Sequence, residues 1–399
     1  MAHKAEILAP CGSFETLEAA LRSGCDAVYL GGEKFSARQN ATNFTDEQLK
    51  EAVRLCHLRG VKVYQAINTV VFDEQLEECK KAVKFAAEIG VDGLITQDLT
   101  LVKICRECCP DLEYHASTQM TIHSESGVKM AKNLGFSRAV LSRELPEHTI
   151  KDLTALGIET EVFVHGALCM SVSGQCYMSA VIGSRSANRG LCAQACRLPA
   201  QGDKITKGQE RYALSLKDMS YVDKLQRLEK DGVSSLKIEG RMKTALYVAT
   251  VARTYRKAID DYLESEEKYR QNMPWYLEQI SNCTYRQFTT GFFFGKPSEE
   301  TQIYDSNTYV KEYTYLGIVG EQNAQGLYRI EQRNKFSVGE EIEVMKPNGD
   351  NIPVTVKAIQ DEEGTPMESA PHPKQVLYID LGHTLEKFDI LRRQEKEEQ

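Results

Sequence analysis

Four cysteines that could hold a metal centre lie in one glycine-containing stretch in the middle of the chain. Cys169 and Cys176 have six residues between them, Cys192 and Cys196 have three, and about fifteen residues separate the two pairs. Four thiolates are the usual ligands of a [4Fe–4S] cluster, and they also suit tetrahedral zinc. Neither spacing matches the common zinc ribbon, so the pattern favours the iron–sulfur cluster over zinc.

Two other interpretations of these cysteines remain open from the residues alone. The four thiols could be free and without a ligand. Alternatively, Cys169 could be a nucleophile activated by the nearby His165, as in enzymes where a histidine deprotonates a cysteine.

Several polar residues stand where predicted strands end. In a closed barrel of parallel strands, the active site lies at the carboxyl ends of the strands, so these residues are candidates for one pocket. The alternative is that they only bind loop backbone. The candidate catalytic residues are His115, His165, Glu239 and Arg241. Other polar strand ends are Asn68, Gln97, Asp98, Ser117 and Gln119.

Charge is distributed unevenly along this acidic chain, whose net charge is −8. Residues 181–257 carry 16 Lys and Arg against 7 Asp and Glu, whereas residues 305–399 carry 11 against 18. A basic stretch on an acidic protein is compatible with a nucleic-acid partner. We therefore predict RNA contacts at Arg185, Arg189 and Lys204.

The elements that must position these residues form a repeating pattern. Eight β-like runs alternate with amphipathic helical runs, and Ser13 and Thr45 are expected to cap two of the helices. The strand runs are nearly all apolar, which is typical of strands covered on both faces. The runs are 6–10, 26–32, 61–68, 92–98, 112–119, 137–142, 159–166 and 234–241.

Together these runs predict a (β/α)8 barrel over residues 1–300, with the cysteines in an insertion over 166–233. From about residue 305 short alternating strands and turn signals predict a small antiparallel β domain, 305–399. The chain has twelve cysteines, no long apolar run and no signal-like start. We therefore expect a cytoplasmic protein without a membrane segment.

The chain resembles the collagenase-like peptidases of the U32 family, a family of unassigned catalytic class. The central match is EVFVHGALC (161–169) followed by GQCYMS (174–179). The resemblance covers nearly all of residues 1–300, and the appended β domain looks like the family's C-terminal domain. Further matches are EILAPCGSFETLEAAL (6–21), GCDAVYLGG (24–32), HASTQMTIHS (115–124), SLKIEGRMKTALYVATVARTYRKAID (235–260) and NCTYRQFTTGF (282–292).

The resemblance implies an activity that the residues alone do not show. Members of this family include oxygen-independent hydroxylases that carry a [4Fe–4S] cluster and act on tRNA, ribosomal RNA or a quinone ring. A barrel with one β domain is most similar to the tRNA branch. That branch makes 5-hydroxyuridine at the wobble position and requires prephenate. The implied partner is therefore tRNA and the implied co-substrate prephenate.

One departure from the family affects the fourth ligand of the cluster. Some members have a cysteine in the stretch aligned with residues 214–220, and this chain has none there. Cys196 is then the expected fourth ligand, with Cys283 in reserve.

Peptidase activity remains the alternative function, although the chain has neither a G-x-S-x-G nor an H-E-x-x-H motif. A cluster-bearing scaffold without catalysis is a third possibility. The polar strand ends argue against it.

Overall fold

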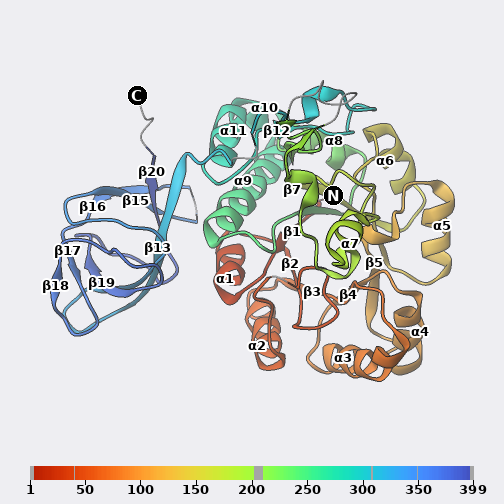
Figure 1. Ribbon diagram of the computed structural model, residues 1–399, viewed down its shortest axis with the longest axis horizontal. Coiled ribbons are helices and arrows are strands. Elements are labelled where there is room, and N and C mark those ends of the chain that lie inside the picture. Colours follow the sequence, from red (N-terminus) through yellow and green to blue (C-terminus); the bar gives the residue numbers. More distant parts are fainter. Residues whose placement is uncertain (1–3, 40, 202–209, 307–308, 348, 396–399) are drawn as a thin grey trace.

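The computed structural model describes residues 4–39, 41–201, 210–306, 309–347 and 349–395. It shows a barrel ringed by helices and a separate all-β domain beside it (Figure 1). None of the described helices is both long enough and apolar enough to cross a membrane.

Eight parallel strands form the barrel, which confirms the fold expected from the sequence. Each strand pairs with the next along the chain up to β7, and β11 pairs with both β7 and β1, which closes the ring. The strands are β1 (Glu6–Pro10), β2 (Ala27–Leu30), β3 (Lys62–Ala66), β4 (Gly93–Thr96), β5 (Glu113–Ala116), β6 (Arg138–Val140), β7 (Glu159–Ala167) and β11 (Ser235–Ile238).

The helices that surround the barrel begin at the expected signals. The hydroxyl of Ser13 accepts a hydrogen bond from the backbone N–H of Thr16, and Thr45 accepts one from Gln48, so both predicted caps are confirmed. The helices are α1 (Phe14–Arg22), α2 (Asp46–His57), α3 (Leu76–Glu88), α4 (Leu99–Cys108), α5 (Glu125–Asn133), α6 (Glu147–Thr154), α8 (Leu225–Lys230), α9 (Ala245–Glu264), α10 (Glu266–Gln271) and α11 (Met273–Ser281).

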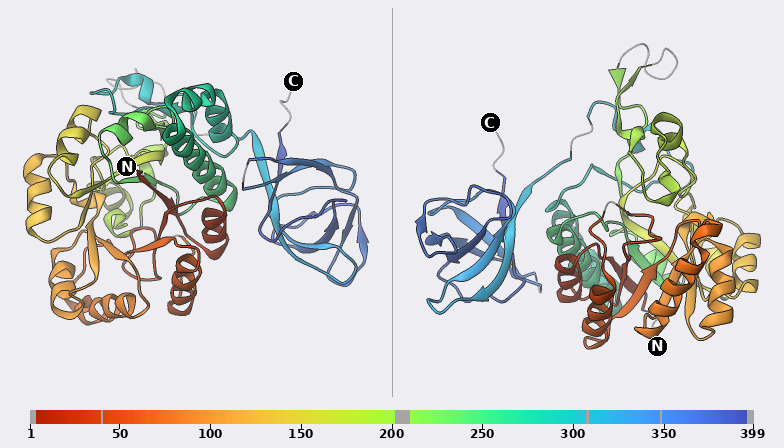
Figure 2. Two further views of the ribbon diagram at one scale, coloured as in Figure 1. Left: turned by 180° about the vertical axis from the view of Figure 1, so that it is seen from behind. Right: turned by 60° about the horizontal axis from the view of Figure 1, so that its bottom comes forward.

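The chain between β7 and β11 makes a long excursion that contains the cysteines. Figure 2 shows it projecting from one end of the barrel. It adds β10 (Asp218–Ser220), which runs antiparallel to β7 and pairs in turn with β12 (Phe288–Thr289). The other elements of the excursion are α7 (Met178–Gly183), the 3-10 turns η3 (Ala187–Arg189) and η4 (Ala195–Arg197), β8 (Ala200–Gln201) and β9 (Glu210–Arg211).

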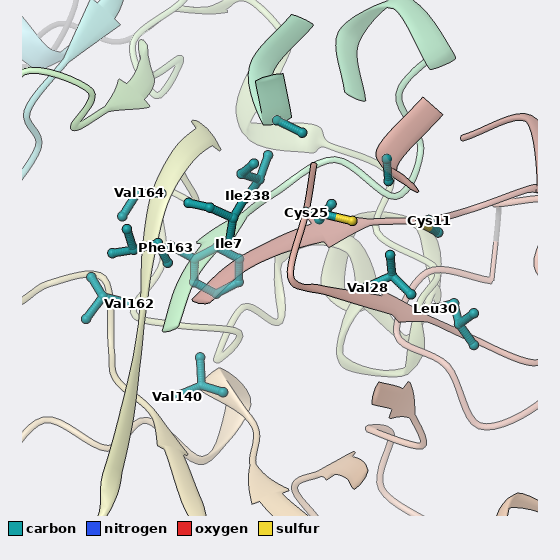
Figure 3. Packing of buried hydrophobic residues seen from close by; sticks show 14 of the residues in the cluster. Ile7, Cys11, Cys25, Val28, Leu30, Val140, Val162, Phe163, Val164 and Ile238 are labelled. Atoms are coloured by element: carbon teal, nitrogen blue, oxygen red, sulfur yellow. The ribbon is translucent and has the colours of Figure 1, made fainter. Parts of the chain in front are cut away.

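Successive residues of β1 belong to two different apolar clusters. Ile7 packs outward, with Val162, Val164 and Ile238, in the large cluster between strands and helices (Figure 3). Its neighbour Leu8 belongs to a small apolar cluster of barrel strands, which also includes Ala27, Tyr29, Tyr64 and Ile95. The alternation follows from the strand geometry, which turns neighbouring side chains to opposite faces.

The C-terminal domain is an antiparallel sheet with its own apolar core. Its strand order is β16-β15-β20-β13-β14-β19-β17-β18. The strands are β13 (Tyr313–Gln322), β14 (Tyr328–Gln332), β15 (Glu341–Met345), β16 (Ile352–Thr355), β17 (Ala358–Gln360), β18 (Pro366–Met367), β19 (Val376–Asp380) and β20 (Ile390–Gln394).

This domain packs against the side of the barrel. Arg22 of α1 donates to the carboxylate of Asp389 at 2.8 Å, and Arg253 of α9 donates to the carbonyl of Lys346 at 2.7 Å. Met345 is buried in the same cluster as the barrel core. The domain thus stands beside α1 and α9, away from the excursion (Figures 1 and 2).

Candidate functional site

The first part of the site is the set of cysteines on the excursion. Cys169 and Cys192 are exposed, Cys176 and Cys196 are half-buried, and all four are free thiols. The sulfur of Cys176 accepts a hydrogen bond from the N–H of Met178, and that of Cys192 accepts one from Gln194, both at 3.4 Å. Backbone donors of this kind are typical around metal-bound thiolates.

Electrostatics shows that the four thiols share one neighbourhood. Burial raises the pKa of Cys196, Arg197 lowers it, and Cys169, Cys192 and Cys176 raise it further. However, no three His, Cys, Asp or Glu side chains of the described residues stand close enough to hold a metal ion. The donor set therefore fits a four-thiolate cluster in its chemistry, whereas the sulfur atoms are not in a closed coordination geometry.

Cys283, the reserve ligand, lies elsewhere. It is 1% exposed, its thiol donates to the carbonyl of Ile280 at 3.4 Å, and burial raises its pKa to about 12. The charged groups that shift the pKa of Cys283 include Lys243 and Asp218. Cys169, Cys176 and Cys192 are not among them. This placement favours Cys196 as the fourth ligand.

Arg197 ties together the two arms of the excursion that hold cysteines. Its side chain is buried, and it donates to the hydroxyl of Ser215 at 3.0 Å and to the carbonyl of Leu168 at 3.3 Å. Leu168 immediately precedes Cys169, and Arg197 immediately follows Cys196. One guanidinium therefore fixes the spacing of these two thiols.

The second part of the site is a group of charged side chains at the carboxyl ends of the strands, which we call the mouth cluster: Arg38, Arg143, Glu239 and Arg241. Glu239 accepts from Arg143 at 2.9 Å and from Arg38 at 3.3 Å. Burial alone would raise the pKa of Glu239, but Arg38, Arg143 and Arg241 outweigh it and hold that pKa at about 2.

The mouth cluster carries more positive than negative charge. Three of its four side chains are poorly solvated, whereas that of Arg38 is 39% exposed. Three arginines face one carboxylate, and burial lowers the pKa of Arg241 to about 10. Arg143 Nε and Arg241 Nη1 are buried and have no hydrogen-bond partner among the residues that the structure describes. Because unpaired buried donors and charges are costly, this arrangement is typical of a site that binds an anion.

The mouth cluster and the cysteines are neighbours. The Cys192 thiol contributes to the raised pKa of Arg38, after Glu239 and other groups. Gly190 brings the excursion onto the loop after β2, because a Cβ there would lie 2.8 Å from the carbonyl oxygen of Ser36. The thiols therefore lie over one side of the barrel mouth.

Glu239 and Arg241 are thus brought together, as the strand-end rule anticipated. Arg38 and Arg143, which complete the cluster, were missed. They lie in the loops after β2 and β6, so the same rule, applied a few residues further along each loop, could have found them.

His115 lies at the opposite end of the barrel, near a second charged group that we call the floor cluster: Glu6, Arg138, Glu159, Glu161 and Lys237. The His115 ring is 1% exposed and packs 4.7 Å from Tyr64, whose hydroxyl donates to Glu6 at 2.8 Å. Burial lowers the pKa of His115.

The floor cluster has a partner for each of its cationic groups. Arg138 donates to Glu6 and Glu159 at 2.8 Å and to Glu161 at 3.3 Å. Lys237 donates to Glu161 at 2.6 Å. Because each cation is paired within the chain, we interpret the floor cluster as a set of ion pairs that stabilises the fold.

His165 turns away from the mouth. Its ring packs against Tyr247 and Tyr255 of α9 and against Phe288, with centroid distances of 5.4 to 5.9 Å. Burial lowers its pKa to about 3, so the imidazole is neutral at pH 7. An enclosed ring with so low a pKa is a weak base, which does not favour the pairing of His165 with Cys169 as a catalytic dyad.

The three predicted RNA contacts have different surroundings. Arg185 is exposed. Arg189 donates to Gln75 at 3.0 Å and lies 3.9 Å above the ring of Phe72, so it also joins the excursion to the barrel. Lys204 lies outside the described residues.

The chain matches two family models and several known proteins. The model for "Peptidase family U32" matches residues 12–303, and that for "Peptidase family U32 C-terminal domain" matches 311–392. The "tRNA hydroxylation protein P1" of Bacillus subtilis is 34% identical over 98% of this chain and 95% of its own length.

Two further relatives have different names. The "23S rRNA 5-hydroxycytidine C2501 synthase" of Escherichia coli is 34% identical over 77% of this chain and 48% of its own length. A "Collagenase" of Porphyromonas gingivalis is 31% identical over 99% of both chains.

Proposed function

Because this chain belongs to peptidase family U32, we propose that it is an RNA-modifying hydroxylase of that family rather than a protease. Two of its relatives are named for hydroxylation of tRNA or synthesis of hydroxycytidine in ribosomal RNA. The observation that carries the proposal is the neighbourhood of four thiols and an anion-binding mouth cluster at one end of the barrel.

In its finer form, the proposal is oxygen-independent conversion of a tRNA wobble uridine to 5-hydroxyuridine, with prephenate as co-substrate. A [4Fe–4S] cluster would be held by Cys169, Cys176, Cys192 and Cys196. Replacing a ring hydrogen by a hydroxyl removes two electrons from the base, so the reaction needs an electron acceptor beyond the chain, to which such a cluster would pass electrons one at a time.

The mouth cluster would bind the co-substrate. Prephenate carries two carboxylates, and the cluster has two positive charges in excess of its single carboxylate. The forks of Arg143 and Arg241, each with an unpaired buried N–H group, suit carboxylate oxygens. Glu239 would orient Arg38 and Arg143 through its two ion pairs.

The proposal is tested by nucleoside mass spectrometry of tRNA from cells that lack the gene. Wild-type protein should restore 5-hydroxyuridine, and Cys192→Ser should not. Protein purified without oxygen should contain about four irons per chain, as four-thiolate ligation requires. Restoration by Cys192→Ser, or stoichiometric zinc in place of iron, would contradict the proposal.

A further inference from the structure

A pocket of about 380 Å³ lies on another side of the cysteine excursion. One wall is the segment after β7, residues 168–172, and the facing wall comes from residues 291–304. Cys169 lines this pocket, whereas the thiol that acts on the mouth cluster is Cys192. The pocket lining contains none of the four residues of the mouth cluster, so the pocket is separate from that cluster.

The facing wall is held in place by backbone hydrogen bonds to the excursion. Ile303 donates to the carbonyl of Ser215 at 2.8 Å, and Lys217 donates to that of Thr301 at 2.9 Å. Leu216 between them forms a β-bridge with Gln302. The pocket is thus preformed, as binding sites for small groups usually are.

The lining combines flat apolar rings with a few fixed polar groups. Phe292 and Tyr304 are both half-buried and both line the pocket. The carboxylate of Glu144 is held by the backbone N–H of Ser173 at 3.0 Å and by its hydroxyl at 2.7 Å. Aromatic faces with a few polar groups are the means by which proteins hold unstacked nucleobases.

Gln302 adds a hydrogen-bonding group to the lining. The hydroxyl of Tyr304 donates to the amide oxygen of Gln302. In this orientation the amide nitrogen is a donor that would pair with an acceptor on the ligand. Uracil presents a carbonyl acceptor at its C4 position, where cytosine presents an amino donor.

We propose that this pocket receives the target base, a uracil ring turned out of its stack. This inference rests on the proposed function, because enzymes that do chemistry on a base act on a base that is single-stranded or turned out of its stack. In this pocket the base lies beside Cys169. It does not compete for space with a co-substrate bound at the mouth cluster, because the two sites share no lining residue.

Photocrosslinking tests the position of the base directly. An anticodon stem-loop with 4-thiouridine at the target position is irradiated with the anaerobically purified full-length protein, and the crosslinked peptide is identified by mass spectrometry. We expect crosslinks within 168–172 or 291–304. Crosslinks confined to the loops that carry Arg38 and Arg143 would overturn the assignment.

A matched pair of variants measures the stacking. Phe292→Ala should lower kcat/KM for hydroxylation about tenfold, because stacking of a base on an aromatic ring contributes roughly that factor or more. Its iron content and visible spectrum should not change. The control is Phe294→Ala, since Phe294 is 65% exposed and is not part of the lining; its kcat/KM should stay at the wild-type value.

The outcomes separate the inference from the function on which it rests. Equal kcat/KM values for Phe292→Ala and wild type, with crosslinks elsewhere, would refute the pocket and leave the hydroxylase intact. Absence of both hydroxylation and crosslinks in the wild-type protein would refute the proposed function itself.

Discussion

The mouth and the floor of this barrel are both lined by ionic groups, most of them buried, yet their charge balance differs. At the floor, Arg138 and Lys237 meet the buried carboxylates of Glu6 and Glu161, and Arg138 also meets Glu159, which is partly exposed. At the mouth, three arginines share the single carboxylate of Glu239, and two N–H groups lack a partner among the described residues.

The difference separates structural ion pairs from a binding site. A buried charge is tolerated when opposite charges and hydrogen bonds surround it. The floor cluster meets this condition within the chain. The mouth cluster would meet it only with an anion that the chain does not provide. Hence, loss of a buried carboxylate should lower stability at either end, whereas changes to the arginines of the mouth cluster should mainly lower binding and activity.

The largest effect is expected at the floor. Glu161→Gln leaves Lys237 and part of Arg138 without a buried counter-charge, so the free energy of unfolding should fall by roughly 3–5 kcal/mol. Urea denaturation measures it. Glu159→Gln is the control, because the Glu159 side chain is 54% exposed and its loss should cost less than about 1 kcal/mol. Equal losses of unfolding free energy in the two variants would show that the buried and the exposed carboxylate of the floor contribute alike.

Acid should weaken the mouth through Glu239. Its pKa of about 2 in the folded chain lies below the ordinary value of 4.5, so its contribution is complete above about pH 4.5 and is lost as the pH falls toward 2. That contribution is on the order of 3 kcal/mol. Glu239→Gln should lower stability at pH 7 and flatten the stability profile between pH 4.5 and 2. An unchanged profile would show that the carboxylate is not held by the arginines.

Loss of the Arg241 guanidinium should lower activity more than stability. Arg241→Lys keeps the charge but not the planar donors, so hydroxylation should fall about tenfold to hundredfold, as expected for a lost hydrogen bond to a charged group. The free energy of unfolding should change by less than about 1 kcal/mol, because the guanidinium lacks a partner at Nη1. A large loss of stability with normal activity would make Arg241 structural.

The smallest effect is stabilisation by a bound anion. Prephenate at tenfold above its Kd should raise the free energy of unfolding of the wild-type chain by about 1.4 kcal/mol. Thermal melting with and without prephenate measures the shift in Tm. Arg241→Lys should show a smaller shift at the same concentration. The absence of a shift in the wild type would argue against an anion site at the mouth.

The sequence was sufficient to predict the barrel because its signals are local and repeated. Apolar strand runs and capping residues such as Ser13 and Thr45 recur with each unit, and each of the eight runs contains a strand. By contrast, β10 and β12 have three and two residues, too few to show an alternation. Such strands depend on partners that are distant in the chain.

The cysteines could be predicted as part of the site because clustered cysteines in a protein have few roles. Residues that only the fold brings together could not be predicted. The cysteine spacing identified the excursion, but it could not show that Arg38 and Arg143 meet at Glu239. His165 shows a second limit. Its pairing with Ile238 follows an irregularity in register between β7 and β11, and its ring packs against α9 instead of facing the mouth. One irregular residue pair reverses the direction that alternation predicts.

The packing around Arg241 also limits how this family can vary. A Cβ at Gly12 would overlap the carbonyl oxygen of Arg241, and a Cβ at Gly31 would overlap its guanidinium. The first overlap involves the backbone of residue 241, so Gly12 is required whatever side chain follows that backbone. The second involves the side chain itself, although the hydroxyl of Ser36 would also lie 2.7 Å from a Cβ at Gly31. Among related chains, Gly31 should therefore be kept wherever the arginine is kept, whereas Gly12 should be kept with or without it, so that one glycine reports on a side chain and the other on the path of the backbone.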